Sequence, residues 1–374
     1  MVSLARRNLL HDRLRFVITV AGVAFAVTLV LVQVGLFMGL LDKATVTIQH
    51  ASADIWVTSK ETPNVDFAHN FPETTVLRVR GVPGVARADN LIIQFMNIQL
   101  PTGAEEGCLV YALEDFAAWN LPWNVQQADV RDLRRGRYLL MDRSAERRYG
   151  PFAVGEYREI LGRRFKIIGT TTGAASFTTA PIVFMDYRNA QELSEQVRNK
   201  TSYVLVKAAP GFDPQAVAAA IRRVAPFNDV YTRDEWARRS RTYWIVSTGL
   251  GMNMGVTVFL GILVGIVVVA QTLYTSAVEH VKEFGTVKAI GGSNWDIYRI
   301  LGEQALIAAV VGFAVGGLMS WGIRPLMAKL YLNVLVSPGF ALAVFVGTVL
   351  MCLGAAMLSF RRVAGIDPAL VFRA

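Results

Sequence analysis

Four long stretches of this chain contain no Asp, Glu, Lys or Arg, and they constrain the fold more than any other feature. The stretches run through residues 16–41, 242–278, 304–323 and 330–360. A helix needs roughly 20 apolar residues to cross the hydrocarbon core of a membrane, and each stretch reaches that length. The sequence therefore predicts four transmembrane helices, at residues 16–41, 244–275, 302–323 and 339–360.

The overall composition agrees with a membrane protein. Hydrophobic residues make up 53% of the 374 residues and charged residues 18%, whereas charged residues are about 25% of a typical soluble domain. The formal net charge is +9, but the chain has no nucleic-acid-binding motif, so we expect no nucleic-acid partner. Cys108 and Cys352 lie in different regions and are not expected to pair, and the four histidines lack zinc-ligand spacing. We expect no metal or other cofactor.

Basic residues at the ends of the predicted helices set the expected orientation. Four arginines precede the first helix, Lys282, Lys288 and Arg299 lie between the second and third, and three arginines follow the fourth. Such residues mark the cytoplasmic side. The first helix is expected to be an uncleaved anchor, because its apolar run is roughly twice as long as that of a signal peptide. Cytoplasmic segments are predicted at 1–15, as an amphipathic N-terminal helix, and at 276–301 and 361–374. Outer segments are predicted at 42–243 and 324–338.

The outer segment 42–243 is long enough to form a core of its own. Apolar and alternating runs predict strands at 54–58, 76–80, 91–100, 108–113, 137–141, 163–169, 182–184 and 203–206. Helices are predicted at 144–149, 187–198 and 214–224, the last one introduced by Asp213 and Pro214. The predicted fold is an α-helical membrane protein with four transmembrane helices plus an α+β extracytoplasmic domain. The second apolar stretch is longer than one crossing needs, so either helical extensions of the first two spans form a stalk beneath this domain, which we favour, or the second span is a tilted helix with a polar-poor loop.

The outer segment also carries a basic cluster at Arg131–Arg148. It would contact an acidic adaptor or a lipid head group, or it is a solvated surface in which acidic residues are interleaved; we favour the solvated surface. No P-loop, nucleophile elbow or zinc-protease motif occurs in the chain. The sequence therefore gives no reason to expect an enzyme. Small residues in the second and third predicted helices permit close helix packing.

The cytoplasmic loop between the second and third helices has an amphipathic pattern. Val278, Val281, Phe284 and Val287 recur every third residue with charges between them, and a Gly-Gly pair follows at 291–292. The pattern is typical of a short amphipathic helix that ends at the glycines. Such a helix either rests in the lipid interface or docks into a groove on another protein.

The loop resembles the signature segment of FtsX-like permeases, the group that includes macrolide exporters and lipoprotein-releasing ABC systems. Its residues read Glu-x-x-Lys-Glu-Phe-Gly-x-x-Lys-Ala-Ile-Gly-Gly-Ser from Glu279 onward. The segment from Ala5 to Arg15, Arg361-Arg362 and Asp367-Pro368-Ala369 are similar to the ends of that family. Within it, the likeness is greatest to the DevC type, which works with a separate ATPase. A chain that begins directly at the first span fits this arrangement.

The resemblance implies a homodimer of permease subunits in the bacterial inner (cytoplasmic) membrane, with both termini in the cytoplasm. The expected partners are an ABC ATPase subunit, a HlyD-like membrane fusion adaptor, membrane lipids and an outer-membrane channel. The function implied is export of a lipid, glycolipid, peptide or drug-like substrate; the alternative is a mechanotransmitting regulator of a cell-wall hydrolase or sensor kinase without cargo. The residues expected to contact the ATPase are Glu279, Lys282, Glu283, Phe284, Gly285, Lys288, Ala289, Gly291 and Gly292.

Overall fold

The computed structural model describes residues 13–174, 176–178, 180–280, 286, 293–330 and 332–363. The chain divides into two compact units. One unit, here called the helical bundle, combines residues 1–39 with residues 251–374, and the other, the inserted domain, comprises residues 40–250. The inserted domain therefore interrupts the bundle after its first helix.

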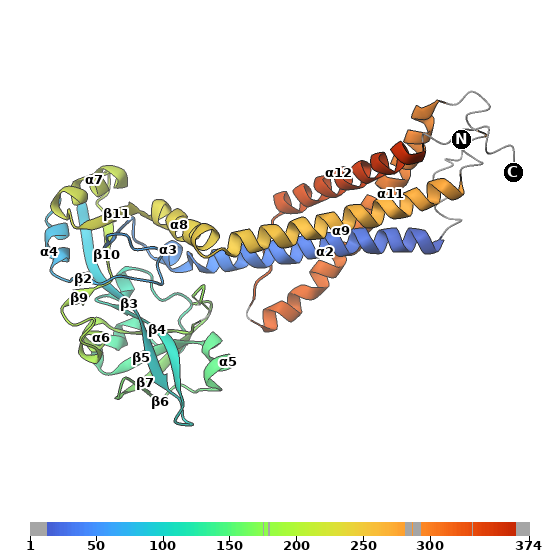
Figure 1. The fold of residues 1–374 in the computed structure, drawn as a ribbon. Coiled ribbons are helices and arrows are strands. Elements are labelled where there is room, and N and C mark those ends of the chain that lie inside the picture. Colours follow the sequence, from blue (N-terminus) through green and yellow to red (C-terminus); the bar gives the residue numbers. More distant parts are fainter. Residues whose placement is uncertain are drawn as a thin grey trace. The chain divides into compact units, whose positions relative to one another are not determined.

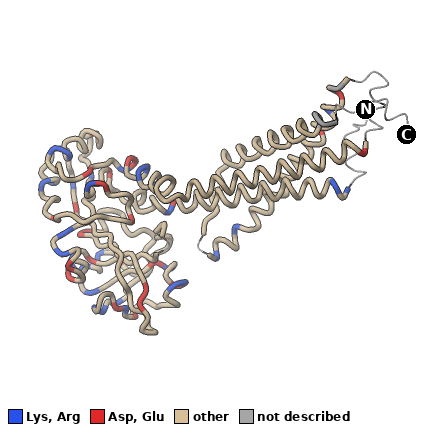
Figure 2. The backbone as a smooth tube through the Cα atoms, in the orientation of Figure 1, with Lys and Arg blue, Asp and Glu red and all other residues tan. Residues whose placement is uncertain are grey.

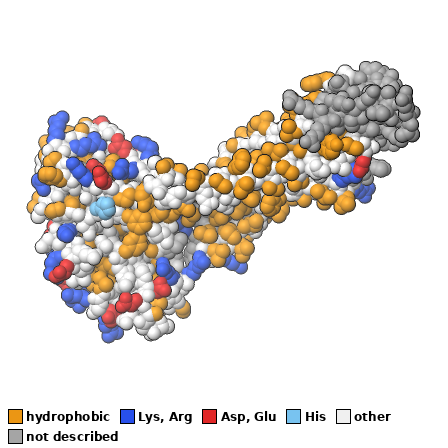
Figure 3. All heavy atoms as spheres, in the orientation of Figure 1, with side chains coloured by type: hydrophobic (Ala, Val, Ile, Leu, Met, Phe, Trp, Pro, Cys, Tyr) orange, Lys and Arg blue, Asp and Glu red, His pale blue; other side chains and the backbone are white. Residues whose placement is uncertain are grey.

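Within its described residues, the helical bundle contains four long helices, each long and apolar enough to cross a membrane (Figure 1). They are α2 (Arg13–Lys43), α9 (Leu250–Glu279), α11 (Asn294–Lys329) and α12 (Pro338–Val363). All four overlap the four predicted transmembrane helices, but α9 begins at Leu250 rather than at the predicted residue 244, and α11 extends well beyond the predicted limits 302–323. Figure 2 shows few charged residues along these helices, and Figure 3 shows hydrophobic side chains over their visible face. The prediction of four membrane-spanning helices is thus confirmed.

The core of the inserted domain is a mixed sheet of nine strands, in the order β11-β1-β10-β3-β4-β8-β5-β7-β6. The pairs β4–β8 and β5–β7 are parallel and the other pairs are antiparallel. The strands are β1 (Ile55–Ser59), β3 (Val85–Gln99), β4 (Glu105–Leu113), β5 (Tyr138–Asp142), β6 (Tyr157–Ile160), β7 (Arg163–Thr171), β8 (Ile182–Asp186), β10 (Tyr203–Ala208) and β11 (Asn228–Thr232). A separate small sheet pairs β2 (Phe71–Pro72) with β9 (Lys200–Thr201).

Both faces of the large sheet are buried. Along β4, Leu109 and Tyr111 pack into one hydrophobic cluster, whereas Val110 and Ala112 pack into another. Successive side chains of a strand point to opposite faces, so a strand between two cores is apolar at every position. This explains the continuous apolar run that predicted β4. The mixture of strands and helices confirms the α+β prediction.

Short helices cover the sheet and join its strands. They are α3 (Val46–His50), α4 (Thr75–Arg80), η1 (Phe116–Ala118), η2 (Val130–Arg135), η3 (Arg143–Ala145), α5 (Glu146–Tyr149), α6 (Tyr187–Leu193), α7 (Pro214–Val224) and α8 (Arg233–Thr242). Helix α7 has the predicted limits, because the Asp213 carboxylate accepts hydrogen bonds from the backbone N–H groups of Gln215 and Ala216 and Pro214 suits the first helical position.

The prediction of a strand at 76–80 is wrong, because these residues lie in α4. Val76 and Val79 are both buried in one cluster with α7. A spacing of three residues places two side chains on the same face of a helix but on opposite faces of a strand. The segment was too short for its pattern to separate the two possibilities.

The chain between α8 and α9 is not one continuous helix. Residues Tyr243–Ser247 form a π-helical turn, and Gly249 has a positive φ of 71° before α9 begins. Left-handed backbone is a common way to end a helix, and glycine adopts it without a steric penalty. At the same end of the domain, the Arg241 guanidinium donates a 3.2 Å hydrogen bond to the Thr45 hydroxyl, and α3 packs on α8. The part of the inserted domain that precedes α9 in the chain is thus built from short helices with a break after α8.

Candidate functional site

Glu279 is the one predicted ATPase-contacting residue that the structure describes, and it is the last residue of α9. Its carboxylate forms a two-fold hydrogen-bonded ion pair with the guanidinium of Arg15, near the start of α2. Both side chains are partly exposed, at 49% and 31%. The ion pair therefore joins the beginning of the first long helix to the point where the predicted amphipathic segment starts.

The other predicted coupling residues lie outside the described residues. They are Lys282, Glu283, Phe284, Gly285, Lys288, Ala289, Gly291 and Gly292. The structure defines the two ends of the segment that contains them. At the near end, His280 Nδ1 is 2.9 Å from the carbonyl oxygen of Ser276. The structure therefore defines the residues before and after the predicted coupling segment.

The far end of this segment is the capped start of α11. The Asp296 carboxylate accepts hydrogen bonds from the backbone N–H and the hydroxyl of Ser293, at 2.8 and 2.9 Å. This reciprocal cap satisfies backbone donors at the helix start. Behind it, Ile297 and Leu301 of α11 pack with Ala277 of α9 in a small buried cluster. The two helices that flank the segment are therefore packed against each other at its base.

Glycines let the long helices of the bundle approach one another closely. A Cβ atom on Gly316 would lie 2.7 Å from the carbonyl oxygen of Ala24, and one on Gly312 would lie 2.5 Å from Val23. A Cβ atom on Gly265 would lie 3.0 Å from the Met351 sulfur of α12 and 3.1 Å from the Ala26 side chain of α2. The predicted role of small residues in helix packing is confirmed at these positions. At Gly255 and Gly317, by contrast, a Cβ atom would meet open space, so these two glycines contact no neighbouring helix among the described residues.

Polar groups connect the helices at a few points. Gln33 of α2, which the sequence marks as polar within a span, donates a 3.1 Å hydrogen bond to the Met254 sulfur of α9. The Ser359 hydroxyl of α12 donates to the Ala270 carbonyl of α9 at 2.8 Å. Such bonds satisfy polar atoms that would otherwise lose water in the membrane. They hold the bundle together without adding a charged group to its interior.

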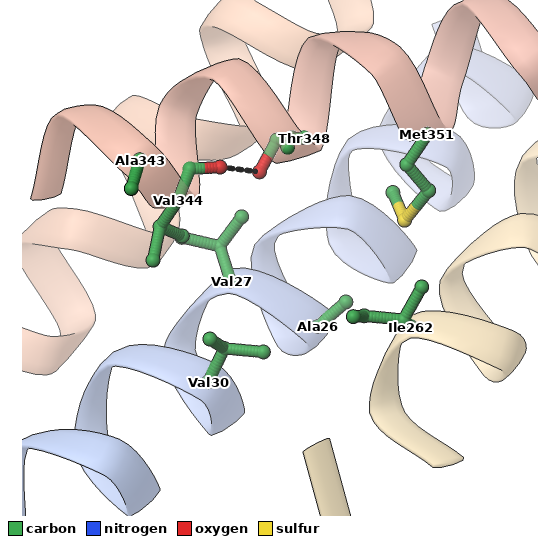
Figure 4. Close-up of a pocket in the computed structure, with 9 residues that line it drawn as sticks. Ala26, Val27, Val30, Ile262, Ala343, Val344, Thr348 and Met351 are labelled. Carbon is green, nitrogen blue, oxygen red and sulfur yellow. Dashed lines mark hydrogen bonds between the residues drawn. The ribbon is translucent and has the colours of Figure 1, made fainter. Parts of the chain in front are cut away.

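A cavity of about 260 Å³ lies among α2, α9 and α12 (Figure 4). Figure 4 shows the Thr348 hydroxyl bonded to the Val344 carbonyl, at 2.7 Å, so this polar group is already satisfied by its own helix. The lining residues are Ala26, Val27, Val30, Ile262, Ala343, Val344, Gly347, Thr348 and Met351. None of these supplies an acid, a base or a nucleophile. The cavity can accommodate apolar groups but offers no chemistry.

One buried carboxyl group in the inserted domain has no counterpart in the sequence analysis. Asp66 is 3% exposed, and burial raises its pKa to about 6 despite hydrogen bonds from Ser176, the Phe177 backbone and Tyr111. No group of three or more His, Cys, Asp or Glu residues within the described part of the chain has the arrangement of a metal site. A lone aspartate in a loop gives no pattern by which sequence analysis would single it out.

Comparison with known proteins gives two family matches that together cover most of the chain. Residues 16–224 match the model of a MacB-like periplasmic core domain, and residues 255–368 match that of an FtsX-like permease C-terminal region. The first match covers more than half of the chain. The second includes the segment that contains the predicted coupling residues.

Two individual relatives agree with these matches. An uncharacterized ABC transporter permease of Mycobacterium tuberculosis is 24% identical over 376 residues, covering 100% of this chain and 99% of the relative. The macrolide export ATP-binding/permease protein MacB of Nitrosomonas europaea is 22% identical over 98% of this chain, which spans 58% of that protein. The solved periplasmic region of MacB from Actinobacillus actinomycetemcomitans covers 50% of this chain, with a TM-score of 0.39 and 8% identity.

Proposed function

Because the chain belongs to the family of ABC transporter permeases with a MacB-like periplasmic core domain and an FtsX-like C-terminal region, we propose that it is the membrane subunit of an exporter. In this proposal a separate ATPase subunit hydrolyses ATP, and the permease converts the resulting motion into movement of the inserted domain. The observation that carries the proposal is the insertion of a large folded domain between the first two of four membrane-spanning helices.

The proposed orientation places the inserted domain outside the cytoplasm of a bacterial inner membrane. The basic residues before the first span, between the second and third spans and after the fourth support this orientation. Both termini and the segment 276–301 then lie in the cytoplasm, where an ATPase is accessible. This topology assigns ATP binding and cargo capture to opposite sides of the membrane.

The proposed contact with the ATPase is the segment that follows Glu279. Its flanking helices pack together at Ala277 and Ile297, and the Arg15–Glu279 ion pair connects α9 to α2. A force applied to the segment would therefore act on α9 and, through the ion pair, on α2. Helices α2 and α9 both lead to the inserted domain, so they provide a covalent route for transmitting the movement.

The further partners in this proposal are a second copy of the chain, a membrane fusion adaptor of the HlyD type and an outer-membrane channel. The cargo class is a lipid, glycolipid, peptide or drug-like molecule. Support for these partners comes from the sequence resemblance to two-subunit exporters, whose permeases work as dimers. These associations can be measured by pull-down. The full chain is tagged and co-expressed with each candidate partner encoded by a neighbouring gene, and the partner that co-purifies is identified.

The coupling proposal is tested with the full chain and its cognate ATPase, reconstituted in nanodiscs. Phe284→Ala and Glu283→Lys are expected to reduce both co-purification of the ATPase and its stimulated ATPase rate by at least fivefold. Lys329→Glu, at the other end of α11, is the matched control and should leave both unchanged. If the two loop variants retain normal co-purification and stimulation, the segment is not the coupling site.

A further inference from the structure

The helix η2 arranges its residues in three rows. A 3₁₀-helix has three residues per turn, so side chains three residues apart lie one above the other. Leu133 is buried in the core, and Val130 packs against the same cluster. Asp132 and Arg135 form a second row and make an ion pair of 2.7 Å. The row of Val130 and Leu133 therefore anchors the helix in the domain, and the opposite charges of Asp132 and Arg135 neutralise each other.

The third row contains two cations. Arg131 and Arg134 are three residues apart on η2, and both are exposed. Among the described residues, neither guanidinium forms an ion pair, whereas the neighbouring Arg135, Arg143 and Arg148 all do. Like charges in adjacent positions repel each other. Arg131 and Arg134 therefore form an aligned pair of cations with no ion-pair partner among the described residues, although the carboxylates of Asp115 and Asp186 lie near enough to interact with the charge of Arg134.

These two arginines line a cleft of about 390 Å³. Arg87 lies in the same cleft and donates a 2.8 Å hydrogen bond to the Asp115 carboxylate. Burial acts to raise the pKa of Asp115, but Arg87 and the nearby charge of Arg134 hold it below its usual value. The cleft thus contains three guanidinium groups and one ionised carboxylate. Its remaining wall is apolar and consists of Phe116, Ala117, Ala118 and Val130.

A larger cleft of about 770 Å³ shares Arg134 with the first. Four acidic residues line it. Glu73 accepts a 3.0 Å hydrogen bond from the Tyr187 hydroxyl, and Glu114 accepts one of 2.9 Å from Arg80. Asp186 accepts one of 2.9 Å from the backbone N–H of Arg188, and Glu192 accepts one of 3.5 Å from Arg163. Arg188 also lines this cleft and, among the described residues, makes no ion pair. The second cleft therefore carries acidic as well as basic groups, and only the first cleft has more cations than anions.

We propose that the first cleft binds an amphipathic anion, with a phosphate or carboxylate head between Arg131 and Arg134. A short apolar tail would lie against Phe116, Ala117 and Val130. Guanidinium groups bind both kinds of head in a forked, two-bond geometry, and an apolar wall excludes water from one side of the ligand. The inference concerns the inserted domain alone, so it holds or fails independently of ATPase coupling.

The test uses the full chain in phosphatidylcholine nanodiscs and isothermal titration calorimetry with three probes: hexyl phosphate, hexanoate and inorganic phosphate. We expect saturable binding of hexyl phosphate, at least fivefold tighter than inorganic phosphate. The double variant Arg131→Gln/Arg134→Gln should weaken it at least tenfold. Ala117→Asp, which adds a negative charge to the wall, should weaken it independently of the arginines.

The matched control is Arg135→Gln, on the same helix but in the row that pairs with Asp132. It should change the affinity less than twofold. Thermal unfolding of each variant confirms that the domain remains folded. The proposal is overturned if the unchanged chain shows no saturable binding of hexyl phosphate, or if Arg135→Gln weakens binding as much as the double variant. Equal affinity for inorganic and hexyl phosphate would refute the role of the apolar wall.

Discussion

The Ser176 hydroxyl donates a 2.8 Å hydrogen bond to the carboxylate of Asp66, which is buried in the inserted domain. The two residues are 110 positions apart in the chain. The bond holds the loop around Ser176 against the turn around Asp66. Phe67 and Phe177, which directly follow Asp66 and Ser176 in the chain, both contact the Trp244 ring. A buried ionisable group therefore lies directly beside the aromatic contacts that precede α9.

Asp66 is expected to make the stability of the inserted domain depend on pH. Its pKa is about 6 in the folded chain, against an ordinary value of 3.8, because burial disfavours the charged form. The folded state therefore holds a proton that the unfolded state has released, and stability falls as pH rises from about 4 to about 6. The loss is about 3 kcal/mol. Thermal unfolding of the full chain between pH 4 and 8 measures it.

Asp66→Asn is expected to remove this pH dependence, because an amide stays neutral. The variant should be more stable than the unchanged chain at pH 8 and similar to it at pH 4. Glu195→Gln, at a side chain that is 88% exposed, serves as the control and should leave the pH profile as it is. A profile that keeps its slope in Asp66→Asn would show that another group causes it.

Gly316 and Gly317 are expected to respond in opposite ways to alanine. At Gly316 the new methyl group would lie 2.7 Å from the Ala24 carbonyl oxygen and 2.8 Å from Val27, so α2 would have to shift. Overpacking of this kind costs about 1–3 kcal/mol. At Gly317 the methyl group meets open space, and alanine favours helix by about 1 kcal/mol. SDS unfolding titrations in mixed micelles compare the two variants; equal effects would contradict the packing.

The Arg15–Glu279 ion pair is expected to contribute little to stability but to align α2 with α9. Because both side chains are partly exposed, a double-mutant cycle should give a coupling energy of no more than about 1 kcal/mol. Arg15→Glu and Glu279→Arg should each lower ATPase stimulation. The combined charge swap should recover part of it. Absence of any recovery in the swapped chain would mean that the pair has no role in alignment.

Trp244 is expected to be a major packing contact of the inserted domain. Its ring stacks on Phe177 with 3.7 Å between centroids. Trp244→Ala removes this contact and should cost about 3–5 kcal/mol. Trp244→Phe keeps a stacked ring and removes an indole N–H that has no hydrogen-bond partner among the described residues, so it should cost much less. Denaturant unfolding of the full chain distinguishes the two, and similar losses in both would argue against stacking as the cause.

Several features of the fold could be predicted because they depend on composition or local pattern. The four membrane spans follow from uninterrupted apolar stretches, and α7 follows from Asp213 and Pro214. The prediction of a strand at 76–80 was wrong, because a five-residue segment contains too few apolar positions to distinguish the periodicity of a helix from that of a strand. The amphipathic segment after Glu279 remains a prediction.

The amino-acid sequence by itself determined the number of spans, the insertion of a large α+β domain after the first span and the family, because these depend on hydrophobicity and local motif. Only the tertiary structure decided which arginines of the basic cluster pair, where Asp66 is buried and which glycines contact a neighbouring helix. Those properties depend on side chains that are brought together from distant positions. Spacing along the chain does not encode the charge and packing environment that such contacts create.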